Sequence, residues 1–351
     1  MRTDIQGMFR THIHAWARSA DRLDLYSCAC DVPSHCYTWS FEPKTDWSAN
    51  YASSKEIRQY FSDFAKKYQL QRFIKLNHQV SNAVWDASSA MWKVDVQDMT
   101  NKKTISTSAH ILINAAGILN AWRYPPIPGI TDKYKGELVH SAAWPDNVDF
   151  KDFVKDKVVG LIGNGSSGIQ ILPNTAPHCK KLVTFIREPT WVAPPLGQEF
   201  TVYSQEERAK FASDRTYHLE TRRQIEASMN NAFAIFHTGS EMQAGTQQYM
   251  LAEMQNKIKD QKLQELLIPK WSVGCRRITP GPNYLESLAR DNVEVVYGEI
   301  ASVSEKGPVM DDGNEYPVDI LICATGFDTT FKPRFPLVGS DGQKLSDKWR
   351  G

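Results

Sequence analysis

The sequence predicts an α/β fold made of two parallel-sheet domains, the second of which carries a helical insertion. Three observations lead to this prediction. An apolar run followed by a glycine-rich turn occupies residues 158–168, near the middle of the 351-residue chain. Two other apolar runs, at 110–119 and 319–328, both continue into Ala-x-Gly. Residues 200–270 have helical periodicity and no proline before Pro269, and strands that alternate with helices are typical of α/β proteins.

The composition is that of an ordinary globular protein, with 41% hydrophobic residues, 23% charged residues and a formal net charge of +1. Such a balance creates no overall field that would attract nucleic acid or an anionic membrane. No apolar run approaches the ~20 residues that span a bilayer, and the first residues lack the apolar core of a signal peptide. We therefore expect a cytoplasmic protein without nucleic-acid or membrane partners. The oligomeric state is left open.

Six cysteines are present, and Cys28, Cys30 and Cys36 form a C-x-C-x5-C cluster. A structural zinc site needs a second pair of ligands at suitable spacing, and no such pair follows. We expect no metal site and interpret the cysteines as thiols of a reducing compartment.

The central turn has the features of a dinucleotide-binding site. Residues 158–162 read as a buried parallel strand. The G-N-G-S-S-G that follows supplies three glycines with different tasks. Gly163 allows the tight turn, Gly165 lets a phosphate approach the backbone, and Gly168 lets the next helix pack against the strand. The amides at the start of that helix would face a pyrophosphate.

A second strand is expected about 20 residues later, ending on a residue that reads the ribose. Residues 182–186 fit this strand, and Arg187 and Glu188 follow it. An arginine suits a ribose 2′-phosphate, whereas an acidic residue suits a free 2′-hydroxyl. The pattern favours NADP, and Glu188 keeps NAD as an alternative.

The two Ala-x-Gly runs predict two such domains, each with a strand that ends beside its ligand. The fold expected from these patterns is therefore α/β with two dinucleotide-binding, Rossmann-like domains. The first domain should begin with its own glycine turn, yet residues 1–30 contain only Gly7.

Residues 134–146 carry a further motif, with Tyr134, Gly136, His140 and Trp144 in the pattern aromatic-x-Gly-x3-His-x3-Trp-Pro. Here the chain resembles the Baeyer–Villiger monooxygenases of the flavin-containing monooxygenase superfamily, and most of all the fungal enzymes of secondary metabolism. Tyrosine stands where phenylalanine is usual. The resemblance runs from about residue 26 to 345 and includes the glycine turn, the segment around Cys275 and the C-A-T-G-F-D motif.

The resemblance implies FAD and NADP as cofactors and a division into domains. Residues 1–150 would form a partial FAD-binding domain with the fingerprint on a linker, and 331–351 would begin the return to it. Residues 151–200 and 271–330 would form the NADP-binding domain, with a helical insertion at 201–270. The family's FAD pyrophosphate turn is not found before Tyr26, and the family continues past residue 351, so we expect a chain truncated at both ends with an incomplete FAD domain.

The resemblance also implies roles for individual residues. Asp31 and Arg277 would meet beside the flavin, where arginine would stabilise the developing oxyanion and Asp31 would orient it. A simple interdomain ion pair is the alternative. The fingerprint residues Gly136, His140 and Trp144 would couple cofactor binding to domain motion. The cofactor-binding residues would be Asp31, Val32, Tyr37, Val80, Gly163, Asn164, Gly165, Ser166, Ser167, Gly168, Ile169, Gln170, Arg187, Glu188, Arg276 and Arg277.

The predicted activity is insertion of oxygen next to a ketone, with molecular oxygen as co-substrate, in the biosynthesis of secondary metabolites of polyketide type. Two alternatives stay open. One is a truncated relative that has lost flavin binding and is inactive or serves cyclisation or isomerisation. The other is an N-hydroxylating flavin monooxygenase.

Overall fold

The computed structural model describes residues 32–145, 148–194, 200–276 and 278–349. They fall into two compact units. The first unit contains Phe61–Arg123 and the chain from Phe327 onward. The second contains the described residues up to Tyr60 together with Tyr124–Gly326. Among the described residues, no helix is both long and apolar enough to cross a membrane.

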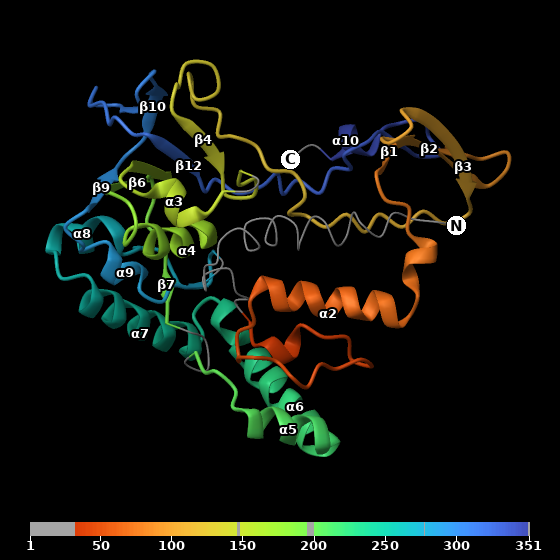
Figure 1. Ribbon diagram of the computed structural model, residues 1–351, viewed down its shortest axis with the longest axis horizontal. Coiled ribbons are helices and arrows are strands. Elements are labelled where there is room, and N and C mark those ends of the chain that lie inside the picture. Colours follow the sequence, from red (N-terminus) through yellow and green to blue (C-terminus); the bar gives the residue numbers. More distant parts are fainter. Residues whose placement is uncertain (1–31, 146–147, 195–199, 277, 350–351) are drawn as a thin grey trace. The chain divides into compact units, whose positions relative to one another are not determined.

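The first unit is built around an antiparallel meander, which lies at the right of Figure 1. Its strands are β1 (His78–Asp86), β2 (Met91–Asp98) and β3 (Lys103–Ala109), and β13 (Leu337–Val338) joins β1 in parallel. Trp85 and Trp92 face each other across β1 and β2 with ring centroids 5.5 Å apart. Such cross-strand aromatic pairs stabilise a sheet. The short elements of this unit are η2 (Leu70–Phe73) and α10 (Leu345–Lys348).

The strand predicted at 110–119 is not formed. β3 ends at Ala109, and residues 111–116 are neither helix nor strand. A parallel strand exists only when a neighbour supplies hydrogen bonds along its length, and among the described residues no strand pairs with this segment. Ile111 and Ile113 are accordingly 62% and 67% exposed.

The second unit is centred on a five-stranded parallel sheet in the order β4–β12–β5–β6–β9. These strands are Glu137–His140, Ile320–Cys323, Val158–Ile162, Lys181–Ile186 and Val293–Tyr297. The strands predicted at 158–162, 182–186 and within 319–328 are therefore present. All four residues of β12 are buried, as expected for a strand covered on both faces.

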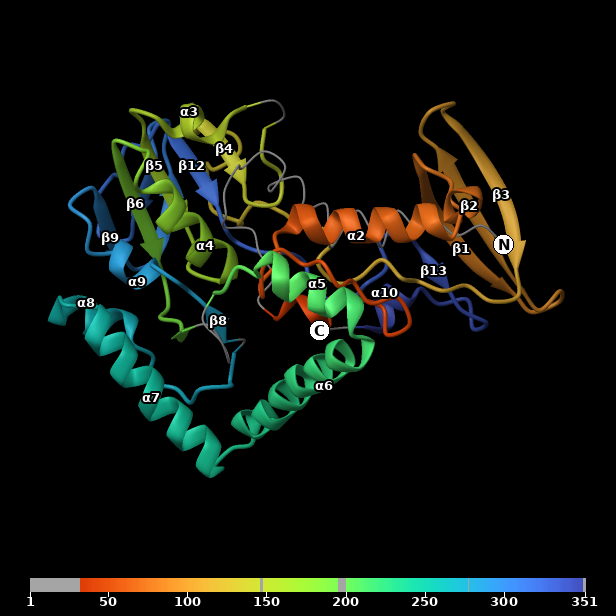
Figure 2. The same ribbon diagram turned by 60° about the horizontal axis from the view of Figure 1, so that its bottom comes forward.

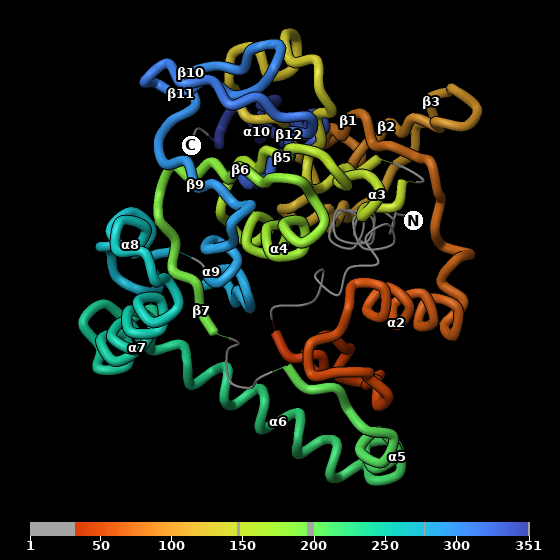
Figure 3. The backbone as a smooth tube through the Cα atoms, turned by 60° about the vertical axis from the view of Figure 1, so that its left-hand side comes forward, coloured from red at the N-terminus to blue at the C-terminus, as the bar shows by residue number. Residues whose placement is uncertain are grey.

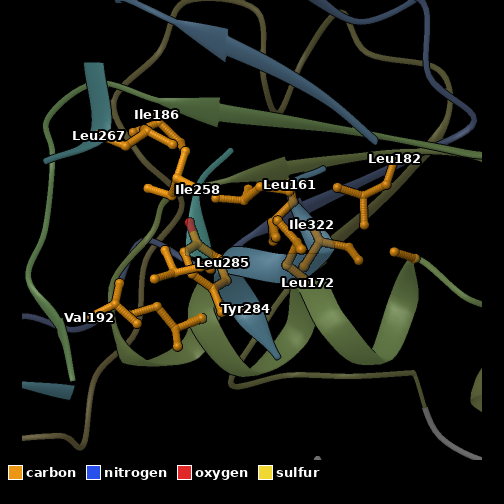
Figure 4. Packing of buried hydrophobic residues seen from close by; sticks show 14 of the residues in the cluster. Leu161, Leu172, Leu182, Ile186, Val192, Ile258, Leu267, Tyr284, Leu285 and Ile322 are labelled. Atoms are coloured by element: carbon orange, nitrogen blue, oxygen red, sulfur yellow. The ribbon is translucent and has the colours of Figure 1, made fainter. Parts of the chain in front are cut away.

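Alternate side chains of this sheet enter two separate cores. On one face, Leu161, Leu182 and Ile322 pack with Leu172 of helix α4 (Ser166–Thr175), as Figure 4 shows. On the other face, Val183, Phe185 and Leu321 pack with the hairpin of β10 (Ile300–Val303) and β11 (Pro308–Met310). Figure 3 shows the hairpin and α4 on opposite sides of the sheet. The period of two along each strand produces this separation.

A helical insertion lies between β7 (Val192–Ala193) and β8 (Thr279–Pro280), as predicted, and Figure 2 shows its two long helices α6 and α7. Its helices are α5 (Gln205–Ser213), α6 (Arg215–Asn231), η3 (Ala232–Phe236), α7 (Glu241–Lys257) and α8 (Gln261–Leu267). Ser204, Asp214, Ser240 and Asp260 cap the four α-helices through their side chains. Met250 and Met254 of α7 join the core beneath the sheet. The remaining elements are η1 (Ser34–Cys36), α2 (Ser54–Lys67), α3 (Phe150–Val154) and α9 (Tyr284–Ser287).

Candidate functional site

The glycine turn joins β5 to α4 at the carboxyl end of the parallel sheet, the edge at which such sheets bind their ligands. Gly163 has φ +103°, and a Cβ there would lie 2.7 Å from the Ala324 carbonyl oxygen. A Cβ on Gly168 would lie 2.0 Å from the Gly163 carbonyl oxygen. Neither position accepts a side chain, so these two glycines are needed for the tight turn and for close helix packing.

Gly165 differs from its neighbours because a Cβ there would meet no atom within 4 Å. The fold itself therefore gives no reason for glycine at this position. Gly165 is also the N-cap residue of α4, a ten-residue helix whose first-turn amides have no carbonyl acceptor within the helix. The open space beside Gly165 leaves room for a phosphate group to approach the backbone, and the helix dipole would also attract it.

The remaining predicted residues of the turn surround this space. Asn164 donates from Nδ2 to the backbone oxygen of Glu188 at 2.9 Å, which ties the turn to the end of β6. Ser166 Oγ lies 2.8 Å from Thr279 Oγ1, which ties the start of α4 to β8. Ile169 is buried in the core, whereas Ser167 and Gln170 are half-buried on the first turns of the helix.

Four charged side chains lie at this edge of the sheet. Arg276 Nη2 is 2.5 Å from Glu188 Oε2, and the Arg276 guanidinium lies over the Trp271 ring at 5.3 Å. Arg187 Nη1 is 3.8 Å from Glu299 Oε1, just after β9. The hydrogen bond from Arg276 lowers the pKa of the Glu188 carboxyl below its ordinary value. The structure thus brings Arg187, Glu188 and Arg276 together with the glycine turn, although 88 residues separate the last two.

The fingerprint begins with Tyr134, whose side chain packs over Gly136. Tyr134 donates from its hydroxyl to the Val318 carbonyl oxygen at 3.0 Å. A Cβ on Gly136 would lie 2.2 Å from that hydroxyl and 2.7 Å from the Asp319 carbonyl oxygen. Gly136 is required here because the tyrosine ring and the chain before β12 occupy the space of a side chain. The motif thereby fixes β4 as the edge strand beside β12.

His140, the last residue of β4, is fully buried. Its Nδ1 accepts a hydrogen bond from the Ala142 amide at 3.1 Å, which leaves the proton on Nε2. Burial lowers the pKa of His140 to about 4, while a hydrogen bond with the backbone of Gly326 acts in the opposite direction. The imidazole is therefore neutral at physiological pH. Trp144 is buried in the core and meets Phe150 edge-to-face at 5.4 Å.

The residues predicted to contact flavin are only partly placed. Val32 and Tyr37 are half-buried beside η1 in the second unit, and Val80 is half-buried in β1 of the first unit. The two predicted catalytic residues, Asp31 and Arg277, lie outside the described residues.

Sequence reasoning missed three residues of this site, namely Trp271, Thr279 and Glu299. Glu299 could have been found, because the apolar run Val-Glu-Val-Val-Tyr just before it is typical of a strand, and that strand, β9, pairs with β6 in the same sheet. Trp271 and Thr279 have no comparable signal. They reach the site through the segment that returns from the helical insertion.

The parallel sheet, the glycine turn and the four charged side chains at the edge of the sheet are together typical of a dinucleotide-binding α/β protein. The family model described as flavin-binding monooxygenase-like matches residues 3–207, and the chain belongs to this family. The family resemblance and the fold class predicted from the sequence are both confirmed.

The chain is similar to curated proteins of fungi and bacteria. It is 35% identical over 326 residues to the FAD-binding monooxygenase moxY of Dothistroma septosporum, covering 91% of this chain and 52% of that protein. It is 34% identical over 330 residues to the FAD-binding monooxygenase stcW of Emericella nidulans, with 92% and 55% covered. A Baeyer-Villiger monooxygenase of Streptomyces coelicolor is 30% identical over 332 residues, with 92% and 60% covered. The chain thus spans little more than half the length of these relatives.

Solved structures of the same kind share the fold. An oxidised steroid monooxygenase bound to NADP superimposes with a TM-score of 0.77 at 29% identity, covering 95% of this chain and 69% of that one. An OTEMO complex with FAD and NADP gives a TM-score of 0.78 at 26% identity, with 96% and 68% covered. The likeness extends over both units of the chain.

Proposed function

We propose that the chain acts as an FAD- and NADPH-dependent monooxygenase of Baeyer–Villiger type, which inserts one oxygen atom next to a ketone carbonyl of a secondary metabolite of polyketide type. The observation that carries this proposal is the fingerprint that leads into β4, where Gly136 is packed beneath Tyr134 and His140 is buried at the end of the strand. Relatives with the printed names of FAD-binding and Baeyer-Villiger monooxygenases support it.

The residues at the glycine turn fit NADP. Open space at Gly165 would receive the pyrophosphate, and the first amides of α4 would bind it. Arg187 and Arg276 would bind the 2′-phosphate, since guanidinium groups form paired, charge-assisted hydrogen bonds with phosphate. When bound, NADPH would supply hydride and FAD would carry the reducing equivalents to oxygen.

The flavin side of the proposal rests on family membership and on the predicted residues. In residues 32–145 the structure describes no glycine turn between a strand and a helix. Val32, Tyr37 and Val80 are proposed to contact FAD. The proposed domain limits are 1–150 for the partial FAD-binding domain, 151–200 with 271–330 for the NADP-binding domain, 201–270 for the helical insertion and 331–351 for the return to the FAD domain. Arg277 is the proposed catalytic residue. Its guanidinium would stabilise the oxyanion that develops on the substrate carbonyl, oriented by Asp31.

The experiment begins with the purified chain incubated with FAD and freed of excess cofactor. We expect the visible absorption bands of bound oxidised flavin, their loss with NADPH under anaerobic conditions, and an ester or lactone from a cyclic or aryl ketone in air. With ¹⁸O₂, the product should gain one labelled atom. A chain that holds no flavin would contradict the proposal and favour the relative that has lost flavin binding.

Arg277→Ala provides the matched control. It should keep the flavin bands and their reduction by NADPH and should lose about 10²–10³ in the rate of ester formation. Arg277→Lys should recover part of that rate, because an ammonium lacks the planar fork of guanidinium. If Arg277→Ala forms ester as fast as the wild type, Arg277 is a structural residue.

A further inference from the structure

Each arginine of the proposed NADP site already has a carboxylate partner in the protein. Glu188 holds Arg276 at 2.5 Å, and Glu299 lies 3.8 Å from Arg187. All four side chains are at least half exposed, so neither ion pair is sealed into the core. The edge of the sheet therefore carries two positive and two negative charges, where a site dedicated to a 2′-phosphate would carry an excess of positive charge.

The backbone fixes both carboxylates beside the place expected for the ribose. Glu188 is tied to the glycine turn, because its carbonyl oxygen accepts from the Asn164 side chain at 2.9 Å. Glu299 is tied to the end of β6, because the amide of the preceding Gly298 donates to the Ile186 carbonyl at 3.0 Å. The backbone of each glutamate is thereby held at the sheet edge, so a carboxylate can leave its arginine only by rotation of its own side chain.

We propose that Glu188 and Glu299 determine cofactor specificity by occupying Arg276 and Arg187 when no 2′-phosphate is bound. This inference rests on the proposed function, since it assigns the NADP site to these arginines. A 2′-phosphate must displace both carboxylates and then stays close to them, so the preference for NADP over NAD is reduced. The carboxylate of Glu188 can instead accept a hydrogen bond from a free ribose hydroxyl, as acidic residues at this position do in NAD sites.

Exposed ion pairs of this kind are individually weak, and this makes the exchange possible. An exposed pair contributes little to stability, whereas hydrogen bonds to charged groups are stronger. A doubly charged phosphate that bonds two arginines can therefore displace the glutamates. Repulsion between the bound phosphate and the two displaced carboxylates would then weaken the binding of NADP.

The test is isothermal titration of the full chain with adenosine 2′,5′-bisphosphate and, separately, with 5′-AMP. Glu188→Gln and Glu299→Gln should each bind the bisphosphate about three- to tenfold more tightly than the wild type, as removal of one nearby exposed charge predicts. Binding of 5′-AMP should be unchanged or weaker. Arg276→Ala serves as the reference for a lost phosphate contact and should weaken binding of the bisphosphate about tenfold or more.

Glu294→Gln is the matched control. Glu294 pairs with Lys181 at 2.6 Å on the same two strands, β6 and β9, but away from the glycine turn. This variant removes an exposed ion pair of the same kind and should leave both affinities unchanged. Thermal melting of all variants verifies that each is folded, which is expected because the substituted side chains are exposed.

The outcomes separate this inference from the proposed function. If the wild type prefers the bisphosphate and the two glutamine variants bind it no more tightly, the specificity role is overturned and the NADP site stands. If the wild type shows no preference for the bisphosphate over 5′-AMP, the NADP site fails and this inference fails with it. Equal tightening in Glu294→Gln would also overturn it, because the effect would then be one of overall charge.

Discussion

At the scale of single residues, the three glycines of the central turn illustrate how the same residue type serves different needs. Gly163 and Gly168 are demanded by the fold, since a methyl group on either would collide with backbone oxygens. Gly165 faces open space, and its glycine is explained by the phosphate that we propose binds in front of α4. Stability and binding can therefore be separated within a single motif.

Gly168→Ala and Gly165→Ala test this separation. Gly168→Ala should lower the free energy of unfolding by about 3 kcal/mol, because its Cβ would lie 2.0 Å from the Gly163 carbonyl oxygen and the helix must shift. Gly165→Ala should stay within about 1 kcal/mol of the wild type, since its backbone is extended and its Cβ has room.

The affinity for NADP should not follow stability, because Gly165→Ala should be nearly as stable as the wild type and still bind NADP weakly. Gly165→Ala should bind NADP at least about tenfold more weakly, because its methyl group takes the space where a phosphate approaches the backbone. Chemical denaturation and fluorescence titration measure the two effects. Wild-type affinity in Gly165→Ala would mean that no phosphate lies at this turn.

At the scale of elements, the fingerprint acts as a clamp for the edge strand β4. The strand has only four residues and, among the strands that the structure describes, pairs with β12 alone, so its own hydrogen bonds hold it weakly. Tyr134 adds a contact by reaching across Gly136 to the chain just before β12. The motif thus secures the strand whose last residue is His140.

Gly136→Ala should displace this edge strand and lower the free energy of unfolding by about 2–3 kcal/mol, because Tyr134 and the Asp319 carbonyl fill the space of the new methyl group. Tyr134→Phe is the matched control. It removes one hydrogen bond, to the Val318 carbonyl, and keeps the ring that is usual in the family, so it should cost about 1 kcal/mol. Denaturant unfolding compares the two, and a Gly136→Ala protein as stable as the wild type would contradict the clamp.

At the scale of the whole molecule, buried neutral histidines make the fold sensitive to mild acid. Burial lowers the pKa of His35 to about 4, with a further effect of the nearby His218 and Arg222, and burial also lowers the pKa of His218. His35 Nδ1 and His218 Nε2 lie 3.1 Å apart and share a hydrogen bond between η1 and α6. His140 of the fingerprint has its pKa lowered to about 4 as well.

The free energy of unfolding should accordingly fall as the pH decreases from about 6.5 to about 4. Above 6.5 these histidines are neutral in both states, and below 6.5 the unfolded chain takes up protons first and is stabilised. Each of His35 and His140 should contribute on the order of 3 kcal/mol over this window. The loss should level off below pH 4, where the folded histidines are protonated as well.

Denaturant unfolding at several pH values measures this dependence. His35→Gln and His140→Gln should each flatten the slope between pH 6.5 and 4, whatever they do to stability at pH 7. His110→Gln, at an exposed position, is the control and should keep the wild-type slope. An unchanged slope in the His35 and His140 variants would assign the acid sensitivity to other groups.

Much of the second unit could be predicted from short stretches of sequence. The strands at 158–162 and 182–186, the glycine turn and the helices between about 200 and 270 are all encoded by patterns of two to twenty residues. The strand at 110–119 was predicted from the same kind of pattern and is absent. An apolar run becomes a strand only if a neighbour pairs with it, and the run itself carries no information about that neighbour.

The sequence by itself determined the family, the parallel sheet and the place of the glycine turn, because a glycine turn after an apolar strand needs only local geometry. Only the tertiary structure decided which charges meet at that site. Glu188 forms an ion pair with Arg276, 88 residues away in the sequence. Arg187 forms an ion pair with Glu299, which follows the neighbouring strand β9. The physical reason is that side-chain partners depend on which strands lie side by side and in what register, and this is settled by packing of the whole core.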